Sequence, residues 1–179
     1  MTVQFLDPVQ EPVAALNAPA PRLATLHGKR LGLYNNDKLN SVRLLELIAE
    51  DLARDFAFDV QTGGYWAFKL MEPDDWEGVD DCDAVILANG DCGACSSSGI
   101  ANAMELEKRG IPCLLISTPP FLDAVATMAK LGGMPDIAWA VIDHPLGSLK
   151  HDELQDRARE AARQFREIIL ADALATAAE

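Results

Sequence analysis

The sequence predicts an α/β protein with a three-layer, Rossmann-like or flavodoxin-like architecture, built on an open, mostly parallel sheet of about five strands. Short apolar runs alternate along the chain with segments whose apolar residues recur at helical spacing. The run CDAVILANG is continuously apolar between polar flanks, which is typical of a strand buried on both faces of a parallel sheet. The length of 179 residues and the hydrophobic content of 49% suffice for one core of this kind.

The predicted elements follow one another in order. Strands are predicted over residues 29–35, 56–62, 82–90, 111–118 and 137–144. Helices are predicted over residues 41–56, 96–110, 120–133 and 151–177. Strands that alternate with helices form right-handed units, and we expect the strand order to switch direction beside the strand at 82–90.

The beginning of the chain differs from the rest. Residues 1–27 contain four of the ten prolines and have no sustained helical or strand pattern. We expect them to form an extended arm that lies over the body or reaches a partner. Residues 28–179 are expected to form a single α/β domain that ends in a long amphipathic helix.

Composition excludes several classes of function. The net charge of −13 argues against nucleic-acid and anionic-membrane partners. We see neither a signal peptide nor an apolar run near the roughly 20 residues that span a bilayer, and a cytoplasmic location is expected. The chain has neither the glycine-rich turn of dinucleotide-binding proteins nor a phosphate-binding loop, so we expect no cofactor.

Polar residues follow the predicted strands, where ligands bind in open parallel sheets. Lys38 is either an anion clamp or a solvated charge, and its position between Asn36 and Asn40 favours the clamp. Tyr65, Trp66, Phe68 and Lys69 could line the mouth of the pocket or belong to the core. The residues predicted to bind a small substrate are Asn36, Lys38, Asn40, Gly90, Asp91, Gly93, Ser96, Ser117 and Thr118.

Two cysteines form a Cys-x-x-Cys pair after the strand at 82–90. Cys92 is predicted in the turn, and Cys95 in or next to the first turn of the following helix, whose positive end lowers the pKa of a thiol. The spacing also permits a local disulfide. Alternatively, both cysteines are small buried side chains in a crowded turn. Cys82 and Cys113 are predicted to be packing residues.

His144 follows the last predicted strand. It is either a proton donor or acceptor at the site, or a turn histidine that is satisfied by backbone groups. His144 is the only further ligand near the cysteine pair, and zinc needs three protein ligands or four, so no metal site is predicted.

The run GDCGACSSSGIANAMELEKRGIPCLLIST resembles the signature segment of the UGSC-type (seleno)proteins, relatives of the selenoprotein B components of glycine and proline reductases. The family motif is selenocysteine or cysteine followed by Gly-Ser-Cys, and then a helix that ends in Leu-Glu-Lys-x-Gly-Ile-Pro. In this chain Cys92 takes the selenocysteine position, Ala94 replaces the serine and Cys95 is the final cysteine.

Two further segments extend the resemblance to roughly residues 1–160. Asn36, Lys38 and Asn40 match an Asn-x-Lys-x-Asn pattern after the opening strand, and residues 144–147 match a His-Pro-Leu-Gly turn. The resemblance implies that Cys92 is the most reactive residue. Because cysteine is a weaker nucleophile and a poorer leaving group than selenocysteine, it implies a related thiol chemistry in place of the reductase reaction itself.

Three functions remain open from the sequence. The first is an enzyme in which Cys92 reacts with a small, anionic or carbonyl-bearing substrate, Cys95 resolves the adduct as a disulfide, and His144 handles a proton. It would need an external reductant such as a thioredoxin-like partner. The second is a non-redox lyase or hydrolase with a cysteine nucleophile. The third is a non-catalytic subunit, or a sulfur or metal carrier, of a larger complex.

We also expect a homodimer or a higher oligomer. The arm and the last helix offer more apolar surface than one small sheet needs. Near the end of that helix, Phe165, Ile168, Ile169 and Leu170 are candidates for the assembly surface.

Overall fold

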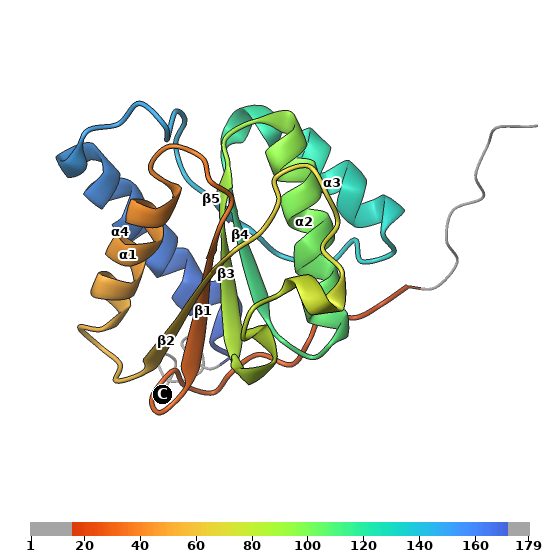
Figure 1. Ribbon diagram of the computed structural model, residues 1–179, viewed down its shortest axis with the longest axis horizontal. Helices are drawn as coiled ribbons and strands as arrows, with labels where there is room; N and C mark the ends of the chain where they lie inside the picture. The colour runs from red at the N-terminus through yellow and green to blue at the C-terminus, as the bar shows by residue number, and fades with distance from the viewer. Residues whose placement is uncertain (1–15, 172–179) are drawn as a thin grey trace, which may run out of the picture.

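A computed structural model describes residues 16–171 and contains one sheet of five parallel strands (Figure 1). The strand order is β2-β1-β3-β4-β5. The strands are β1 (Arg30–Asn35), β2 (Asp59–Gly64), β3 (Ala84–Gly90), β4 (Cys113–Ser117) and β5 (Ala140–Val141). The predicted fold class is therefore confirmed. The order switches direction between β1 and β3, so the turn that carries Cys92 leaves the sheet beside the switch point.

Helices cover both faces of the sheet (Figure 1). α1 (Ser41–Leu52) and α4 (His151–Ile169) pack on one face, and α2 (Gly93–Lys108) and α3 (Leu122–Leu131) on the other. Every residue of β3 and β4 is buried, because each of these strands lies between two neighbours and two helix layers. This double burial explains why both strands are so apolar.

Short 3₁₀ helices interrupt two connections. η1 (Pro73–Asp75) and η2 (Val79–Asp81) lie between β2 and β3, and η3 (Pro119–Phe121) lies between β4 and α3. None of the helices between residues 16 and 171 is long and apolar enough to cross a membrane.

The last strand is shorter than predicted. The sequence predicts a strand over residues 137–144, but β5 comprises only Ala140 and Val141. β5 lies at the edge of the sheet, and the Gln164 side chain of α4 accepts a hydrogen bond from the Val141 N–H (2.8 Å) and donates one to its carbonyl (2.7 Å). The glutamine amide therefore occupies the backbone groups that a further strand would need.

The described part of the arm lies against the chain itself. Leu23 pairs with Leu170 in a parallel bridge, and the Arg22 guanidinium pairs with the buried Glu107 carboxylate at the end of α2. Residues 1–15, and the predicted helical residues 172–177, lie outside the part of the chain that the structure describes.

The apolar end of α4 is already covered. Phe165 and Ile169 are fully buried in the core beneath α4, Leu170 is buried beside it, and Ile168 is partly buried. Most of the apolar surface of these side chains is therefore used within the chain itself. The homodimer stays a prediction, which light scattering at micromolar concentration would test.

Candidate active site at the Cys92–Cys95 turn

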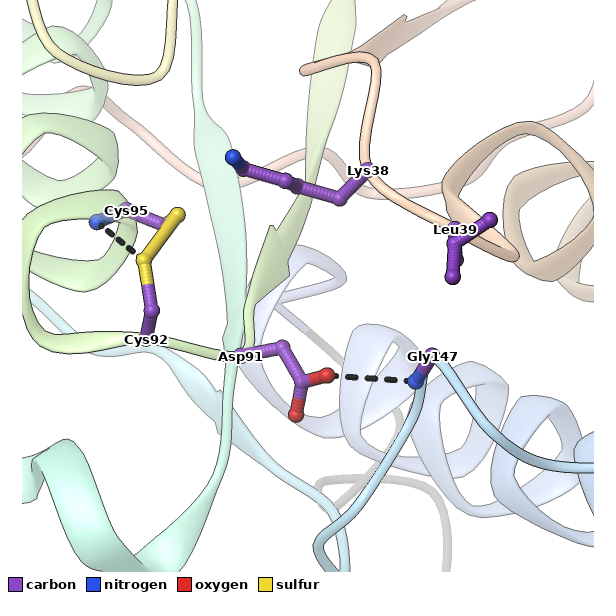
Figure 2. A pocket seen from close by; sticks show the side chains of 6 residues that line it. All are labelled: Lys38, Leu39, Asp91, Cys92, Cys95 and Gly147. Carbon is purple, nitrogen blue, oxygen red and sulfur yellow. Dashed lines mark hydrogen bonds between the residues drawn. A yellow bond between two sulfur atoms is a disulfide. The ribbon is translucent and has the colours of Figure 1, made fainter.

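A cavity of about 230 Å³ opens at the carboxyl end of the sheet (Figure 2). Three segments meet around it: the β1–α1 loop, the β3–α2 turn and the turn before α4. Its lining residues are Lys38, Leu39, Asp91, Cys92, Cys95 and Gly147. Pockets for drug-sized ligands measure roughly 300–1,000 Å³, so this cavity suits a smaller molecule.

Cys92 and Cys95 form a disulfide on the wall of the cavity (Figure 2). Cys92 is the N-cap of α2, and the Cys95 N–H donates a hydrogen bond to the Cys92 Sγ (3.1 Å). Cys95 is fully buried, whereas Cys92 is half-buried. After reduction the same N–H and the positive end of the helix would stabilise a thiolate at Cys92.

Asp91 connects the cysteine turn to the turn before α4. Its carboxylate accepts hydrogen bonds from the backbone N–H groups of Leu146 (3.3 Å) and Gly147 (3.1 Å; Figure 2). The same carboxylate lies 2.9 Å from the His144 Nδ1. Asp91 is predicted to bind substrate, but its carboxylate already interacts with three hydrogen-bond donors of the protein itself.

The surroundings of His144 determine which ring nitrogen carries hydrogen. Nδ1 lies near the Asp91 carboxylate and 3.3 Å from the Thr118 Oγ1. The Thr118 hydroxyl donates its own hydrogen to the Gly90 carbonyl (3.1 Å), so it can only accept from the histidine. Two acceptors place the hydrogen on Nδ1, which leaves Nε2 of the neutral ring as a proton acceptor.

The two asparagines of the predicted site hold backbone segments. The Asn36 side chain donates to the Asn89 carbonyl (2.9 Å) and accepts from the Asn89 N–H (3.1 Å). It does so where the pairing of β3 with β4 shifts register, between Leu87 and Gly90. The Asn40 side chain donates to the carbonyls of Leu146 and Leu149. Neither residue lines the cavity.

Two predicted serines lie behind the cysteine turn. Ser96 and Ser117 are fully buried and share a hydrogen bond of 3.3 Å. A Cβ on Gly90 would lie 2.7 Å from the Ser96 Oγ, so Gly90 allows the close packing of β3 against these hydroxyls. A Cβ on Gly93 would meet only the Phe121 ring, at 4.0 Å. The predicted role of these four residues in substrate binding is not tested by their positions.

Lys38 and the connection after β2 complete the surroundings of the cavity. The Lys38 Nζ lies 4.8 Å from the centroid of the exposed Phe68 ring. Tyr65 is instead buried in the core, and Lys69 pairs with Asp75 (2.7 Å).

Sequence reasoning did not include Leu39 and Gly147 among the site residues, because an apolar side chain and a turn glycine have no chemical signature.

The remaining cysteines are buried away from the cavity. Burial raises the pKa of the Cys113 thiol well above its usual value, and the nearby Glu107 carboxylate adds to this shift. Burial also raises the pKa of Cys82. Among residues 16–171, no cluster of three or more histidine, cysteine and acidic side chains could hold a metal ion.

The fold and the site together define a doubly wound α/β protein with a cysteine pair at its topological switch point. The chain belongs to the UGSC family, whose model matches residues 4–171. A search of curated proteins finds no match. Family membership and the close cysteine pair are compatible with thiol chemistry.

Proposed function

We propose that the protein is a thiol-dependent enzyme that uses Cys92 and Cys95 for the two-electron reduction of a small substrate. The observation that carries this proposal is the disulfide itself, which lies in the wall of a cavity at the N-terminus of α2. A catalytic cysteine needs access, stabilisation of its thiolate and a neighbour that releases the adduct. Access is provided because Cys92 is only half-buried, and the Cys95 N–H would stabilise its thiolate. The Cys95 thiol would release the adduct.

The reaction can be written so that atoms and electrons balance. The Cys92 thiolate attacks the group R of a substrate R–X, a Cys92–R bond forms, and X leaves with a proton. The Cys95 thiolate then attacks the Cys92 sulfur, the Cys92–R bond breaks, and R leaves with the electron pair as a stabilised anion, such as a thiolate or an enolate, which takes up the second proton. The substrate becomes RH and HX, and the two thiols become the disulfide.

Two further components complete a catalytic cycle. A dithiol, such as that of a thioredoxin-like protein, returns the disulfide to two thiols and is itself oxidised. We assign proton transfer to the Nε2 of His144, because the Asp91 carboxylate orients the ring through Nδ1.

Mass spectrometry of the purified protein tests the redox role. In glutathione buffers of graded potential, we expect the Cys92–Cys95 peptide to lose and regain the mass of two hydrogen atoms reversibly. Cys92→Ser and Cys95→Ser should both abolish this change, whereas Cys82→Ala should leave it intact, because Cys82 lies outside the cavity. A pair that stays reduced under all these conditions would rule out the redox proposal.

The two cysteine variants also distinguish the roles of the thiols. With a small disulfide as a model substrate, Cys95→Ser should accumulate a mixed disulfide on Cys92, since nothing resolves it. Cys92→Ser should form no adduct at the turn, because a serine hydroxyl stays protonated without a dedicated base. An adduct on Cys95 in the Cys92→Ser protein would reverse the assignment.

A further inference from the structure

Among residues 16–171, the cation that lines the cavity has no anionic partner. Lys38 extends from the β1–α1 loop toward the turn that carries the disulfide (Figure 2). Within the described residues its ammonium forms no ion pair, and it lies over the ring of Phe68. An aromatic face attracts a cation without cancelling its charge, so the charge of Lys38 remains available to a ligand.

The carboxylate in the same cavity does not compete for this charge. Asp91 is engaged by the His144 Nδ1 and by two backbone N–H groups of the neighbouring turn. The other lining groups are the disulfide, the Leu39 side chain and the Gly147 backbone. The cavity therefore holds a lysine that forms no ion pair within the described residues, and a carboxylate whose oxygens are engaged by three donors of the protein.

The Phe68 backbone is anchored to the helix that carries the cysteines. On one side of Phe68, the Ala67 carbonyl accepts a hydrogen bond from the Ser98 hydroxyl. On the other side, the Lys69 carbonyl accepts one from the Asn102 amide (3.0 Å). Both donors belong to α2, so the backbone at Phe68 is tethered to the helix that carries Cys92 and Cys95.

The anchored backbone keeps the Phe68 side chain in an exposed position that is otherwise unfavourable. The Phe68 side chain is 70% exposed, although a phenylalanine gains free energy by burial. A lysine side chain has four rotatable bonds and therefore many conformations. An ammonium that must stay over a small cavity needs a contact that limits these conformations. The Phe68 ring supplies such a contact from a tethered loop.

We infer that Lys38 selects small carboxylate ligands for reaction at Cys92, and that Phe68 is the positioning residue that holds the Lys38 ammonium over the cavity. The inference rests on the proposed thiol function and names its substrate class. The volume of about 230 Å³ limits the ligand to a small molecule, and the position of Lys38 places the carboxylate of that ligand beside the reacting sulfur.

A pair of alkylating reagents tests this selection without knowledge of the natural substrate. Iodoacetate and iodoacetamide are nearly the same size and both lose iodide as the thiolate forms a carbon–sulfur bond, but only iodoacetate carries a carboxylate. In the Cys95→Ser protein, which cannot form the disulfide, the ratio of the two alkylation rates at Cys92 reports attraction of the anion. Peptide mapping by mass spectrometry measures both rates.

Three variants in this background give the expected result. Lys38→Met should lower the iodoacetate-to-iodoacetamide ratio about fivefold, as expected for one charge near contact distance in a solvated site. Phe68→Ala should lower it about twofold, and Phe68→Tyr should restore it, because tyrosine keeps the aromatic face. Lys69→Met is the matched control: Lys69 is paired with Asp75, so the ratio should not change.

The outcomes separate this inference from the proposed function. If Cys92 reacts with neither reagent faster than the buried Cys113, the thiol function is wrong. If Cys92 reacts readily but Lys38→Met leaves the ratio unchanged, only the carboxylate selection is wrong. An equal fall in both rates would mean that Lys38 stabilises the thiolate and does not bind the ligand. A ratio that Phe68→Ala does not change would overturn the positioning role.

Discussion

The carboxylate of Asp91 accepts a hydrogen bond from the Gly147 N–H (3.1 Å) and joins the cysteine turn to a segment 56 residues further along the chain. The same carboxylate orients His144, so one side chain next to Cys92 determines the positions of two other parts of the site. The geometry of the site therefore depends on contacts between loops as well as on the sheet beneath them.

Replacement of Asp91 should loosen this connection. Asp91→Asn keeps the shape of the side chain but replaces one acceptor oxygen by an NH₂ group, which would face a backbone N–H or the His144 Nδ1–H. We expect a loss of about 1–3 kcal/mol in the free energy of unfolding, measured by urea denaturation. Amide hydrogen exchange at Leu146 and Gly147 should also become faster.

A second carboxylate serves as the control for that experiment. Asp136 is exposed in the loop before β5, and Asp136→Asn should change the free energy of unfolding by less than about 0.5 kcal/mol. Equal effects of the two substitutions would show that Asp91 has no special structural role.

The four thiols of the reduced protein should differ in reactivity. At neutral pH and with limiting iodoacetamide, we expect label first on Cys92, the most exposed of the four, more slowly on the buried Cys82 and Cys95, and none on Cys113 until the protein unfolds. Burial keeps Cys113 inaccessible and holds its pKa well above the usual value, so little thiolate is present. The control is the urea-denatured protein, in which all four cysteines should be labelled at similar rates.

A pH series sharpens the same measurement. Because the pKa of Cys113 is raised, its labelling should remain slow as the pH rises through the range in which an ordinary cysteine ionises. Rapid labelling of Cys113 at neutral pH would contradict the buried position that the structure gives it.

The ion pair between the arm and α2 should contribute substantially to stability. Glu107 is almost completely buried, accepts two hydrogen bonds from Arg22, and also accepts from the N–H groups of Ala20 and Cys113. Arg22→Met leaves the buried carboxylate without its cation and should lower the free energy of unfolding by about 3 kcal/mol. Chemical denaturation followed by circular dichroism measures the change.

Two further variants give this prediction its controls. Arg159→Met removes an exposed partner of Asp156 and should cost less than about 1 kcal/mol. Adding Glu107→Gln to Arg22→Met should recover part of the lost stability, since the unpaired charge is then gone. If the double variant is no more stable than Arg22→Met, the cost does not come from the unpaired carboxylate.

Two glycines of the cysteine turn should respond differently to alanine. In Gly90→Ala the new Cβ would lie 2.7 Å from the Ser96 Oγ and 3.0 Å from the Ile116 carbonyl, so β3 must shift, and we expect a loss of about 1–3 kcal/mol. In Gly93→Ala the nearest atom outside the helix is 4.0 Å away, and the free energy of unfolding should not fall. Thermal unfolding of both variants compares them directly. Similar losses would show that the packing behind the turn is not tight at Gly90.

Much of the fold could be predicted because the relevant signals are local. The continuous apolar runs of β3 and β4 follow from burial on both faces, and this burial is visible residue by residue. The way in which the open edge of β5 is covered could not be predicted, because the Gln164 amide that occupies it comes from α4. An apolar run shows that a segment is buried, but not which backbone groups find a strand partner.

The sequence alone determined where the candidate site lies: Cys92 and Cys95 follow a central parallel strand and begin a helix, and both properties are local. Only the tertiary structure decided what the polar neighbours do. Asn36 and Asn40 match the pattern as well as Lys38, yet both amides hold backbone segments while the Lys38 ammonium lies over Phe68. The physical reason is that a hydrogen bond or a cation–π contact depends on distances of a few ångströms between segments that are far apart in the chain. Spacing along the sequence cannot specify such distances.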